Sequence, residues 1–305
     1  MSAASQLALP FTDLCEIPTA SPWCQRWNRR RHSWRHIRDG GFDSCHYVVA
    51  ELAEASAKAF VVEHHYSGSY PAATRRFGLF DVADGEPRLV GVAVFGTPAG
   101  PTVLTRAFPG LEPGVESLDC SRFVLKDECL ANAESWFLAR CHDELRAAGI
   151  RGVLSFADPV PRRNSAGHLT AVGHVGTIYQ ASNAVYTGRA TARTLTLLPD
   201  GTILNARAAQ KVRRQEQGHR YVEHRLIALG APIPRAGGTP AVWLREALNM
   251  IGARRLRHRG AHRYAWQLGG NRRARERVAL GHTAQQPYPK CADPEQQTSS
   301  YVDSL

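Results

Sequence analysis

Polar and chemically reactive side chains gather between Ser155 and Gly188, where a plain core strand would be apolar. The segment Gly152–Ala157 has the length and composition of a buried strand, and it ends at Asp158, which a proline follows. Because proline cannot donate to a strand ladder, we expect the strand to stop there and to hold the Asp158 carboxylate at its end. This carboxylate could act as a general base, unless it only caps the following turn.

Hydrogen-bonding and aromatic side chains follow this carboxylate closely in the sequence. They are His168, His174, Tyr179, Gln180, Ser182, Asn183 and Tyr186. Single tyrosines of this kind are often half-buried amphipathic residues, but packing alone does not require the whole set of donors, acceptors and aromatic faces. The segment therefore predicts a substrate site.

An arginine interrupts an apolar row in the strand predicted over residues 116–125. Period-two alternation places Leu118, Cys120, Arg122 and Val124 on one strand face. Burying an unpaired guanidinium would cost about several kcal/mol, so Arg122 is expected to pair with a carboxylate such as Asp158 or to line a cavity that receives an anion. A frayed strand, with Arg122 in water, is the alternative.

A helix predicted over residues 51–62 carries further reactive groups towards this region. It delivers His64, His65 and Tyr66 at its end or just past it, before the turn that Gly68 permits. We therefore expect both histidines in a loop beside the strands.

The best-defined helix follows the arginine strand. Asn132 is its predicted N-cap and Gly149 its stop, and its apolar stripe comprises Phe137, Cys141, Leu145 and Ala148. Ser135 lies in the first turn, where free backbone N–H groups could hold an anion.

The remaining elements complete a mixed α/β (α+β) fold with a mainly antiparallel sheet flanked by helices. Strands are predicted at residues 77–80, 89–95, 193–198 and 262–268, and helices at residues 206–229 and 241–251. The first two strands form a hairpin around Asp84-Gly85. We divide the chain into an arginine- and tryptophan-rich arm (1–41), a catalytic core (42–200), a basic helical region with the closing strand (201–280) and a disordered tail (281–305).

Positive charge is concentrated at the two ends of the chain. Residues 1–200 carry 20 Lys/Arg and 20 Asp/Glu, whereas residues 201–305 carry 18 against 7, so the net charge of +11 lies in the last third. This distribution predicts a polyanionic partner, unless the basic blocks are only a solvated face and a flexible arm. The expected DNA-binding residues are Arg29, Arg30, Arg31, Lys211, Arg213, Arg214, Arg255 and Arg257.

Cysteine usage and hydropathy point to a cytoplasmic protein. Seven scattered cysteines without a Cys-x-x-Cys pair indicate neither a disulfide framework nor a zinc ribbon. No apolar run is long enough for a membrane span, and the first residues lack the apolar centre of a signal peptide. No membrane association is therefore expected.

Five short motifs, in this order, resemble the Mom family of bacteriophage DNA-modification proteins. They are His64-His65-Tyr66-Ser67-Gly68, Leu118-Asp-Cys-Ser-Arg122-Phe, Asn132-Ala-Glu-Ser135, Ser155-Phe-Ala-Asp158-Pro and Gly176-Thr-Ile-Tyr179-Gln-Ala-Ser-Asn183. The resemblance covers about residues 56–190 and the strand around Arg263. The long N-terminal arm and the extended C-terminal third depart from the family pattern.

The resemblance implies a fold similar to the Gcn5-related N-acetyltransferases (GNATs). It also implies a transferase that places an acetamido (methylcarbamoyl) group on the exocyclic N6 of adenine in double-stranded DNA and so hides the DNA from host restriction enzymes. The implied catalytic residues are His65, Tyr66, Arg122, Ser135, Asp158 and Tyr179, three of which (Arg122, Asp158 and Tyr179) the residue patterns had already singled out.

The donor of the acetamido group is the open question. Ordinary acetyl transfer would give an amide, whereas the family's product is joined to N6 through the methyl carbon. Acetyl-CoA is the expected cofactor, with Ser135 and Asn132 as its candidate contacts, although the loop before the helix has no glycine and carries Asp127 and Glu128. Ferrous iron is a second candidate, with His64, His65 and Asp158 as ligands.

Two other functions fit part of the sequence. A conventional acetyl-CoA-dependent N-acetyltransferase of a protein or small-molecule amine would leave the basic C-terminal third unused. A non-catalytic DNA-binding protein would use that charge. It would not explain the polar cluster around Asp158 and Tyr179.

Overall fold

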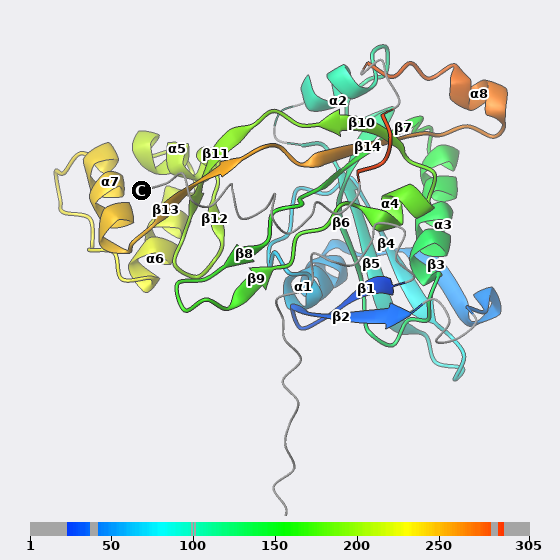
Figure 1. Ribbon diagram of the computed structural model, residues 1–305, viewed down its shortest axis with the longest axis horizontal. Helices are drawn as coiled ribbons and strands as arrows, with labels where there is room; N and C mark the ends of the chain where they lie inside the picture. Colours follow the sequence, from blue (N-terminus) through cyan, green and yellow to red (C-terminus); the bar gives the residue numbers. More distant parts are fainter. Residues whose placement is uncertain (1–22, 37–41, 99, 101, 282–285, 290–305) are drawn as a thin grey trace, which may run out of the picture.

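A seven-stranded sheet forms the centre of the molecule in the computed structural model (Figure 1). The structure describes residues 23–36, 42–98, 100, 102–281 and 286–289; within 23–36 it describes the side chains of Arg26, Arg29 and Arg30. The strand order is β10-β14-β7-β6-β5-β4-β3, and every neighbouring pair is antiparallel except β6 and β7. The expected mixed fold with a mainly antiparallel sheet is thus confirmed.

Five strands of this sheet were predicted from the sequence, whereas β3 and β10 were not. The strands of the sheet are β3 (Tyr47–Glu51), β4 (Arg75–Asp81), β5 (Arg88–Gly96), β6 (Ser117–Leu125), β7 (Gly152–Ala157), β10 (Val185–Arg189) and β14 (His262–Gln267). The β4–β5 hairpin turns at Gly85, whose φ of 88° is a conformation that glycine adopts readily. The predicted closing strand is β14, which lies between β7 and β10 inside the sheet.

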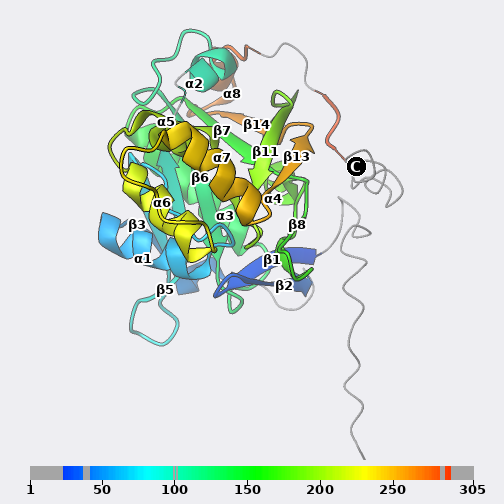
Figure 2. The ribbon, with the colours of Figure 1, turned by 90° about the vertical axis from the view of Figure 1, so that its left-hand side faces the viewer.

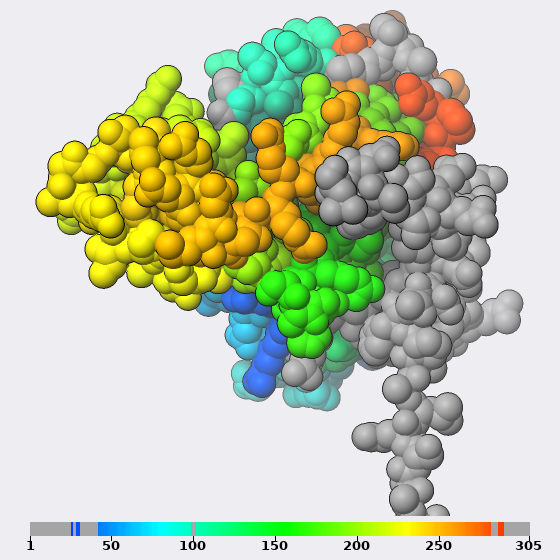
Figure 3. All heavy atoms as spheres, turned by 60° about the vertical axis from the view of Figure 1, so that its left-hand side comes forward, coloured from blue at the N-terminus to red at the C-terminus, as the bar shows by residue number. Residues whose placement is uncertain are grey.

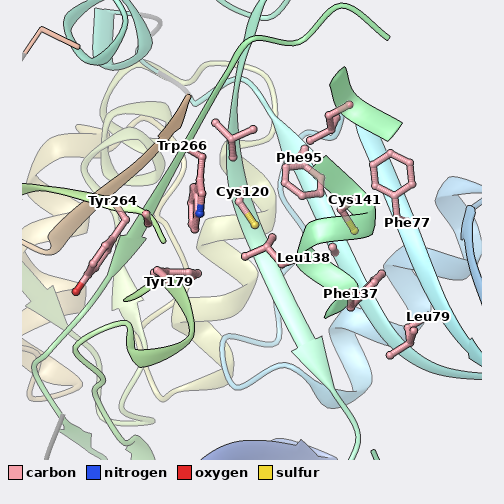
Figure 4. Close-up of a cluster of buried hydrophobic side chains, with 14 of the residues drawn as sticks. Phe77, Leu79, Phe95, Cys120, Phe137, Leu138, Cys141, Tyr179, Tyr264 and Trp266 are labelled. Carbon is pink, nitrogen blue, oxygen red and sulfur yellow. The ribbon is translucent and has the colours of Figure 1, made fainter. Parts of the chain in front are cut away.

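Helices cover both faces of this sheet. On one face, α3 (Ala133–Ala147) buries Phe137, Cys141 and Leu145 of the predicted stripe against β5 and β6 (Figure 4). Ala148 is the exposed C-cap. On the other face, α1 (Glu54–His64) and α2 (Thr102–Ala107) pack in two separate apolar clusters. Each fully buried large apolar side chain stabilises the fold by about 1.5–3 kcal/mol, so helix packing on both faces stabilises the sheet.

The C-terminal third builds a helical unit at the end of a two-stranded ribbon (Figures 1 and 2). Beyond β10 the chain continues into β11 (Arg193–Leu197), and β13 (Arg254–His258) leads back into β14; β11 also pairs with β12 (Ile203–Leu204). The strand predicted at 193–198 is therefore real but lies in this smaller sheet. The unit has its own apolar core, separate from the main one.

Three helices make up the unit, and one prediction there was wrong. The helix expected over residues 206–229 is two helices, α5 (Ala206–Arg214) and α6 (His219–Ala228). Gln215 and Gly218, both with positive φ, break the helix between them. The third helix, α7 (Pro240–Met250), lies as predicted, with proline in its first turn.

The N-terminal region contains an ordered hairpin where an irregular arm was expected. Strands β1 (Trp23–Asn28) and β2 (Arg31–His36) pair around a two-residue turn of Arg29 and Arg30, both with positive φ. The fully buried Arg26 side chain forms an ion pair with Glu134 and donates hydrogen bonds to the carbonyls of Cys129 and Leu130. The hairpin is therefore fixed to the start of α3.

Short elements complete the fold. They are the 3₁₀ helix Ser44–His46, β8 (Arg162–Arg163), β9 (Leu169–Ala171), α4 (Thr177–Ala181) and α8 (Arg272–Glu276). None of the helices in the described part of the chain has the length and apolar character needed to cross a membrane. The predicted disordered tail falls mostly outside the described residues.

Candidate active site

The parallel strands β6 and β7 pair over only part of their length and then separate. Their pairing covers only Ser117, Leu118 and Asp119 of β6, although both strands continue further. Beyond Leu154, the Ser155 hydroxyl donates a hydrogen bond to the Cys120 carbonyl at 3.1 Å and so replaces the interrupted ladder. We call the separation of the two strands beyond this pairing the split. Arg122 of β6 and Asp158, which follows β7, both lie beyond the paired residues.

Arg122 lies on the opposite face of the sheet from the one predicted, because β6 has a β-bulge at Ser121. Val94 and Phe95 are adjacent on β5, yet they pair with Arg122 and Cys120, which skips one β6 residue. Leu118 and Cys120 therefore pack on the α3 face, whereas Val124 packs on the α1 face, which Arg122 shares. The bulge also places Asp119 on the same face as Arg122, because Asp119 pairs with Gly96.

Arg122 is held by the loop that follows α1. Its guanidinium donates to the Ser69 carbonyl and hydroxyl, both at 3.0 Å, and to the Ser121 carbonyl at 2.6 Å. The expected partner was the Asp158 carboxylate, but Arg122 forms no ion pair with any of the described residues. Desolvation lowers its pKa, while the nearby Tyr66 and Asp119 act in the opposite direction. The group is a positioned cation without a neutralising contact.

Asp119 is a buried carboxylate with one oxygen unused. Ser121 donates a hydrogen bond to Oδ2 at 2.8 Å, whereas the buried Oδ1 has no partner among the described residues. Desolvation raises the pKa of Asp119 to about 6, against the opposing effects of the Ser121 hydrogen bond and Arg122. An unpaired buried acceptor costs about 1–3 kcal/mol, and such strain is common where an atom awaits a substrate.

Asp158 lies at the end of β7, as predicted, but it is fully engaged. It accepts hydrogen bonds from Arg162 at 2.5 Å, from His258 Nε2 at 2.8 Å and from the Val160 amide at 3.0 Å. Because the Gly260 amide donates to His258 Nδ1, the imidazole proton is on Nε2 and points at Asp158. These contacts outweigh burial and hold the pKa of Asp158 far below its usual range, so this carboxylate is a poor proton acceptor.

His65 and Tyr66 flank the site at the end of α1. The Ser67 amide donates to His65 Nδ1 at 3.2 Å, which leaves the proton on Nε2. The two rings are in contact, with centroids 4.3 Å apart and planes tilted by 31°. Burial, together with the neighbouring Arg122 and His174, holds the pKa of His65 well below its usual range, so the imidazole is neutral at physiological pH.

Tyr179 reaches the split from the α3 side, on the short helix α4 (Figure 4). Its ring lies 5.3 Å from Tyr264, 5.4 Å from Trp266 and 6.3 Å from His174, measured between centroids. Burial raises the pKa of Tyr179, whose hydroxyl hydrogen-bonds Ser155. The residue is therefore a neutral phenol in an aromatic wall.

A small cavity lies beside Tyr66 and Asp158. It has a volume of about 10 Å³ and is lined by Tyr66, Asp158, Val160, Arg162, Ala171, Val172, Gly173 and His174. This is room for about one water molecule. A nucleobase is too large for this volume.

The first turn of α3 does not fit a coenzyme diphosphate. Asn132 is exposed, has a φ of 73° and makes no side-chain cap hydrogen bond, while the Ser135 hydroxyl bonds back to the Asn132 carbonyl. The buried Arg26–Glu134 ion pair occupies this turn. Ser135 and Asn132 therefore lie in a turn that does not suit the expected binding of acetyl-CoA.

The expected iron ligands do not converge. His64 is the last residue of α1, where its Nδ1 accepts from the Arg29 amide at 3.3 Å and its ring packs on Phe60. Among the described residues no group of three or more His, Cys, Asp or Glu side chains is arranged to hold a metal ion. The set of His64, His65 and Asp158 therefore does not form the predicted centre.

The predicted DNA-binding arginines fall in two places. Arg30 donates to the Val62 carbonyl at the end of α1, and Arg29 forms an exposed ion pair with Glu63; the Arg31 side chain lies outside the described residues. Lys211, Arg213 and Arg214 lie on α5, and Arg255 and Arg257 on β13. Arg213 and Arg255 line a cavity of about 520 Å³ in the helical unit.

Two residues at the site were not predicted from the sequence. Asp119 was not among the expected site residues, although a carboxylate inside a central strand was a usable signal. His258 is separated from Asp158 by 100 residues, and no local pattern could have joined them.

Comparison with known proteins identifies the family. The model of the Mom protein family matches residues 46–290, whereas no curated protein matches the chain. Two solved structures are each 10% identical to it. A candidate phosphinothricin N-acetyltransferase has a TM-score of 0.29 and is matched over 50% of this chain and 87% of its own. A tandem GNAT protein from the clavulanic acid biosynthesis pathway has a TM-score of 0.30 and is matched over 74% and 75%.

These structural likenesses are too distant to support any functional argument. The family match is different, because it spans most of the chain and includes all five motifs together with β14 and the helical unit. The chain therefore belongs to the Mom protein family.

Proposed function

We propose that this protein is a DNA-modifying transferase that places an acetamido group on the exocyclic N6 of adenine and so protects DNA from restriction. Membership of the Mom family supports DNA modification as the general activity. The observation that carries the catalytic part is the placement of two groups on the same face of β6: the Asp119 carboxylate, whose Oδ1 has no partner among the described residues, and the Arg122 guanidinium.

Adenine N6 needs a proton acceptor because its lone pair is conjugated into the ring. In the proposed reaction, Asp119 accepts a proton from N6 through its free Oδ1, and its pKa of about 6 suits a base that works near neutral pH. Asp158 supplies no such oxygen, since its carboxylate is bound by Arg162, His258 and the Val160 amide. Asp158 is instead assigned a positioning role.

The bond changes define what the donor must be. The bond from N6 to the methyl carbon of the acetamide forms while the bond from that carbon to a leaving group breaks, and the leaving group departs with the electron pair. Arg122 would stabilise the negative charge that develops on the leaving group. The donor is therefore an acetamide that carries a leaving group on its methyl carbon.

Aromatic side chains offer a surface for an adenine that has left the duplex. Flipping a base costs about a few kcal/mol, and stacking against Tyr66, which lines the cavity, would offset part of this cost. The cavity beside Tyr66 has a volume of only about 10 Å³, so the site must widen before a base can enter. The neutral state of His65 avoids placing a second cation against Arg122.

Mass spectrometry of nucleosides tests this proposal. Plasmid DNA from cells that express the wild-type chain should contain an adenosine heavier by one acetamido group. The species should be strongly reduced with Arg122→Ala and with Asp119→Asn, whereas the surface control Asp143→Asn on α3 should retain it. Resistance of the plasmid to adenine-sensitive restriction enzymes should follow the same order.

Two outcomes would overturn the proposal. Only ordinary nucleosides from well-expressed protein, together with transfer of acetyl groups from acetyl-CoA to amines, would favour a conventional N-acetyltransferase. Unmodified DNA together with tight, salt-sensitive binding would favour a non-catalytic DNA-binding protein.

A further inference from the structure

The helical unit contains a cavity that the chemistry at the β6–β7 split does not use. It has a volume of about 520 Å³ and lies between the small sheet and the helices α5 and α7. Its lining comprises Thr194, Thr196, Arg213, Ala241, Leu244, Arg245, Leu248, Asn249, Ala253 and Arg255. In Figure 3 the unit (yellow) projects from one side of the molecule, so it is open to a large partner.

The polar groups in this cavity are those that bind phosphate. Arg213, Arg245 and Arg255 come from three different elements and are exposed. None of the three forms an ion pair or a side-chain hydrogen bond within the described part of the chain, whereas eleven other arginines there pair with a carboxylate. Three uncompensated guanidinium groups repel one another unless an anion lies between them.

Hydroxyl groups extend the same wall. In the β11–β13 ladder, Thr196 stands opposite Arg255 and Thr194 opposite Arg257, so all four side chains share one face of the small sheet. The lining contains no carboxylate and no aromatic ring. This composition suits the oxygens of a sugar–phosphate backbone better than a stacked base.

Strand β13 connects this cavity directly to the site. His258, at one end of β13, donates to Asp158, and Arg255 lies three residues earlier on the same strand. Three residues of a strand span about 10 Å. A stacked nucleic-acid strand covers that length in about three nucleotides, at roughly 3.4 Å each.

We propose that the cavity lined by Arg213, Arg245 and Arg255 binds a backbone phosphate of the DNA substrate, a few nucleotides from the adenine to be modified. The inference rests on the proposed function in taking DNA as the substrate. It adds a second contact that fixes the register of the strand, so that phosphate binding at the helical unit presents one particular nucleotide to the split.

Salt-dependent DNA binding tests this proposal. Fluorescence anisotropy of a labelled duplex should be recorded over a range of salt concentrations for the full chain and for the triple variant Arg213→Gln, Arg245→Gln, Arg255→Gln. Loss of one phosphate contact should make the negative slope of log K against log[salt] shallower by about 0.9 and weaken binding about eightfold at 0.1 M salt. The variant Arg213→Lys, Arg245→Lys, Arg255→Lys should keep most of the slope.

A charge-matched control separates the cavity from overall charge. Arg106, Arg140 and Arg272 are exposed residues on α2, α3 and α8, away from the helical unit (Figure 1). Their triple change to glutamine alters the net charge equally but should leave the slope close to that of the wild type. Equal effects of both glutamine triples, or no effect of the cavity triple, would overturn the proposal. If the cavity triple does not fold, the single change Arg255→Gln should show part of the same loss.

Two further measurements separate the possible failures. If DNA binding is unchanged but the cavity triple loses binding of acetyl-CoA, the phosphate belongs to a coenzyme and the proposal is wrong. If wild-type protein modifies adenine while the cavity triple keeps its slope, the cavity proposal fails and the proposed function stands. If DNA stays unmodified while the cavity triple loses slope, the proposed function fails and the phosphate site stands.

Discussion

Replacing Asp119 with asparagine separates a chemical role from an effect on folding. Asparagine keeps the shape of the side chain and an oxygen that can accept from Ser121, but it cannot take a proton from N6. Loss of a general base reduces a rate by about 10²–10⁴. The wild-type rate should increase about tenfold per pH unit until the pH reaches the pKa of about 6, and then level off.

The same substitution should remove a pH-dependent cost to stability. The folded pKa of Asp119 is raised from 3.8 to about 6. The native carboxyl therefore holds its proton more tightly than the unfolded one, so its contribution is most favourable below about pH 4 and is lost as the pH rises to about 6. At 1.36 kcal/mol per pKa unit, the wild type loses about 3 kcal/mol of stability over this pH range. The net gain from Asp119→Asn is smaller than this by the cost of the unpaired asparagine amide, which does not depend on pH.

Urea denaturation of both proteins measures this difference. The free energy of unfolding of Asp119→Asn minus that of the wild type should increase by about 3 kcal/mol between about pH 4 and pH 7. Titration of the other groups is common to both proteins and cancels in the difference. A variant that modifies DNA at the wild-type rate, or a difference that does not change with pH, would refute the assignment of Asp119 as a desolvated base.

Three further substitutions test the surrounding structure. Arg26→Ala leaves a buried carboxylate unpaired and should lower the free energy of unfolding by about 3–5 kcal/mol in urea, whereas the exposed Arg29→Ala should change it by less than about 0.5 kcal/mol. Arg122→Ala frees the Ser69 loop and should reduce DNA modification by about 10²–10³ in nucleoside analysis while the melting temperature falls only slightly. Asp158→Asn removes a carboxylate whose pKa is held far below its usual range, so it should destabilise the protein by about 2–5 kcal/mol at neutral pH, and this gap should narrow as the wild type is acidified.

Local patterns in the sequence predicted the regular elements well. Strand Gly152–Ala157 and the buried residues of α3 follow directly from apolar spacing and from the residues that flank each element. The position of Asp158 at a strand end follows in the same way, because Pro159 excludes a longer ladder.

The active-site geometry depends on departures from those patterns. Strict alternation put Arg122 in the row of Cys120, but the bulge at Ser121 shifts the register by one residue and moves it to the opposite face. The contact between His258 and Asp158 depends on long-range pairing of β14 with β7, which periodicity does not encode. The break between α5 and α6 was different, since Gly218 was a visible signal for it.

The helical unit is attached to the main sheet at two paired points. Ala190 donates a backbone hydrogen bond to the Ala261 carbonyl, so the chain leaves the sheet and re-enters it at neighbouring positions. Geometrically, everything between these residues could be exchanged for a tight turn without disturbing the order of the seven strands. Such an exchange would also remove His258, the donor to Asp158. The helical unit therefore supplies a hydrogen bond at the site that no residue of the seven-stranded sheet replaces.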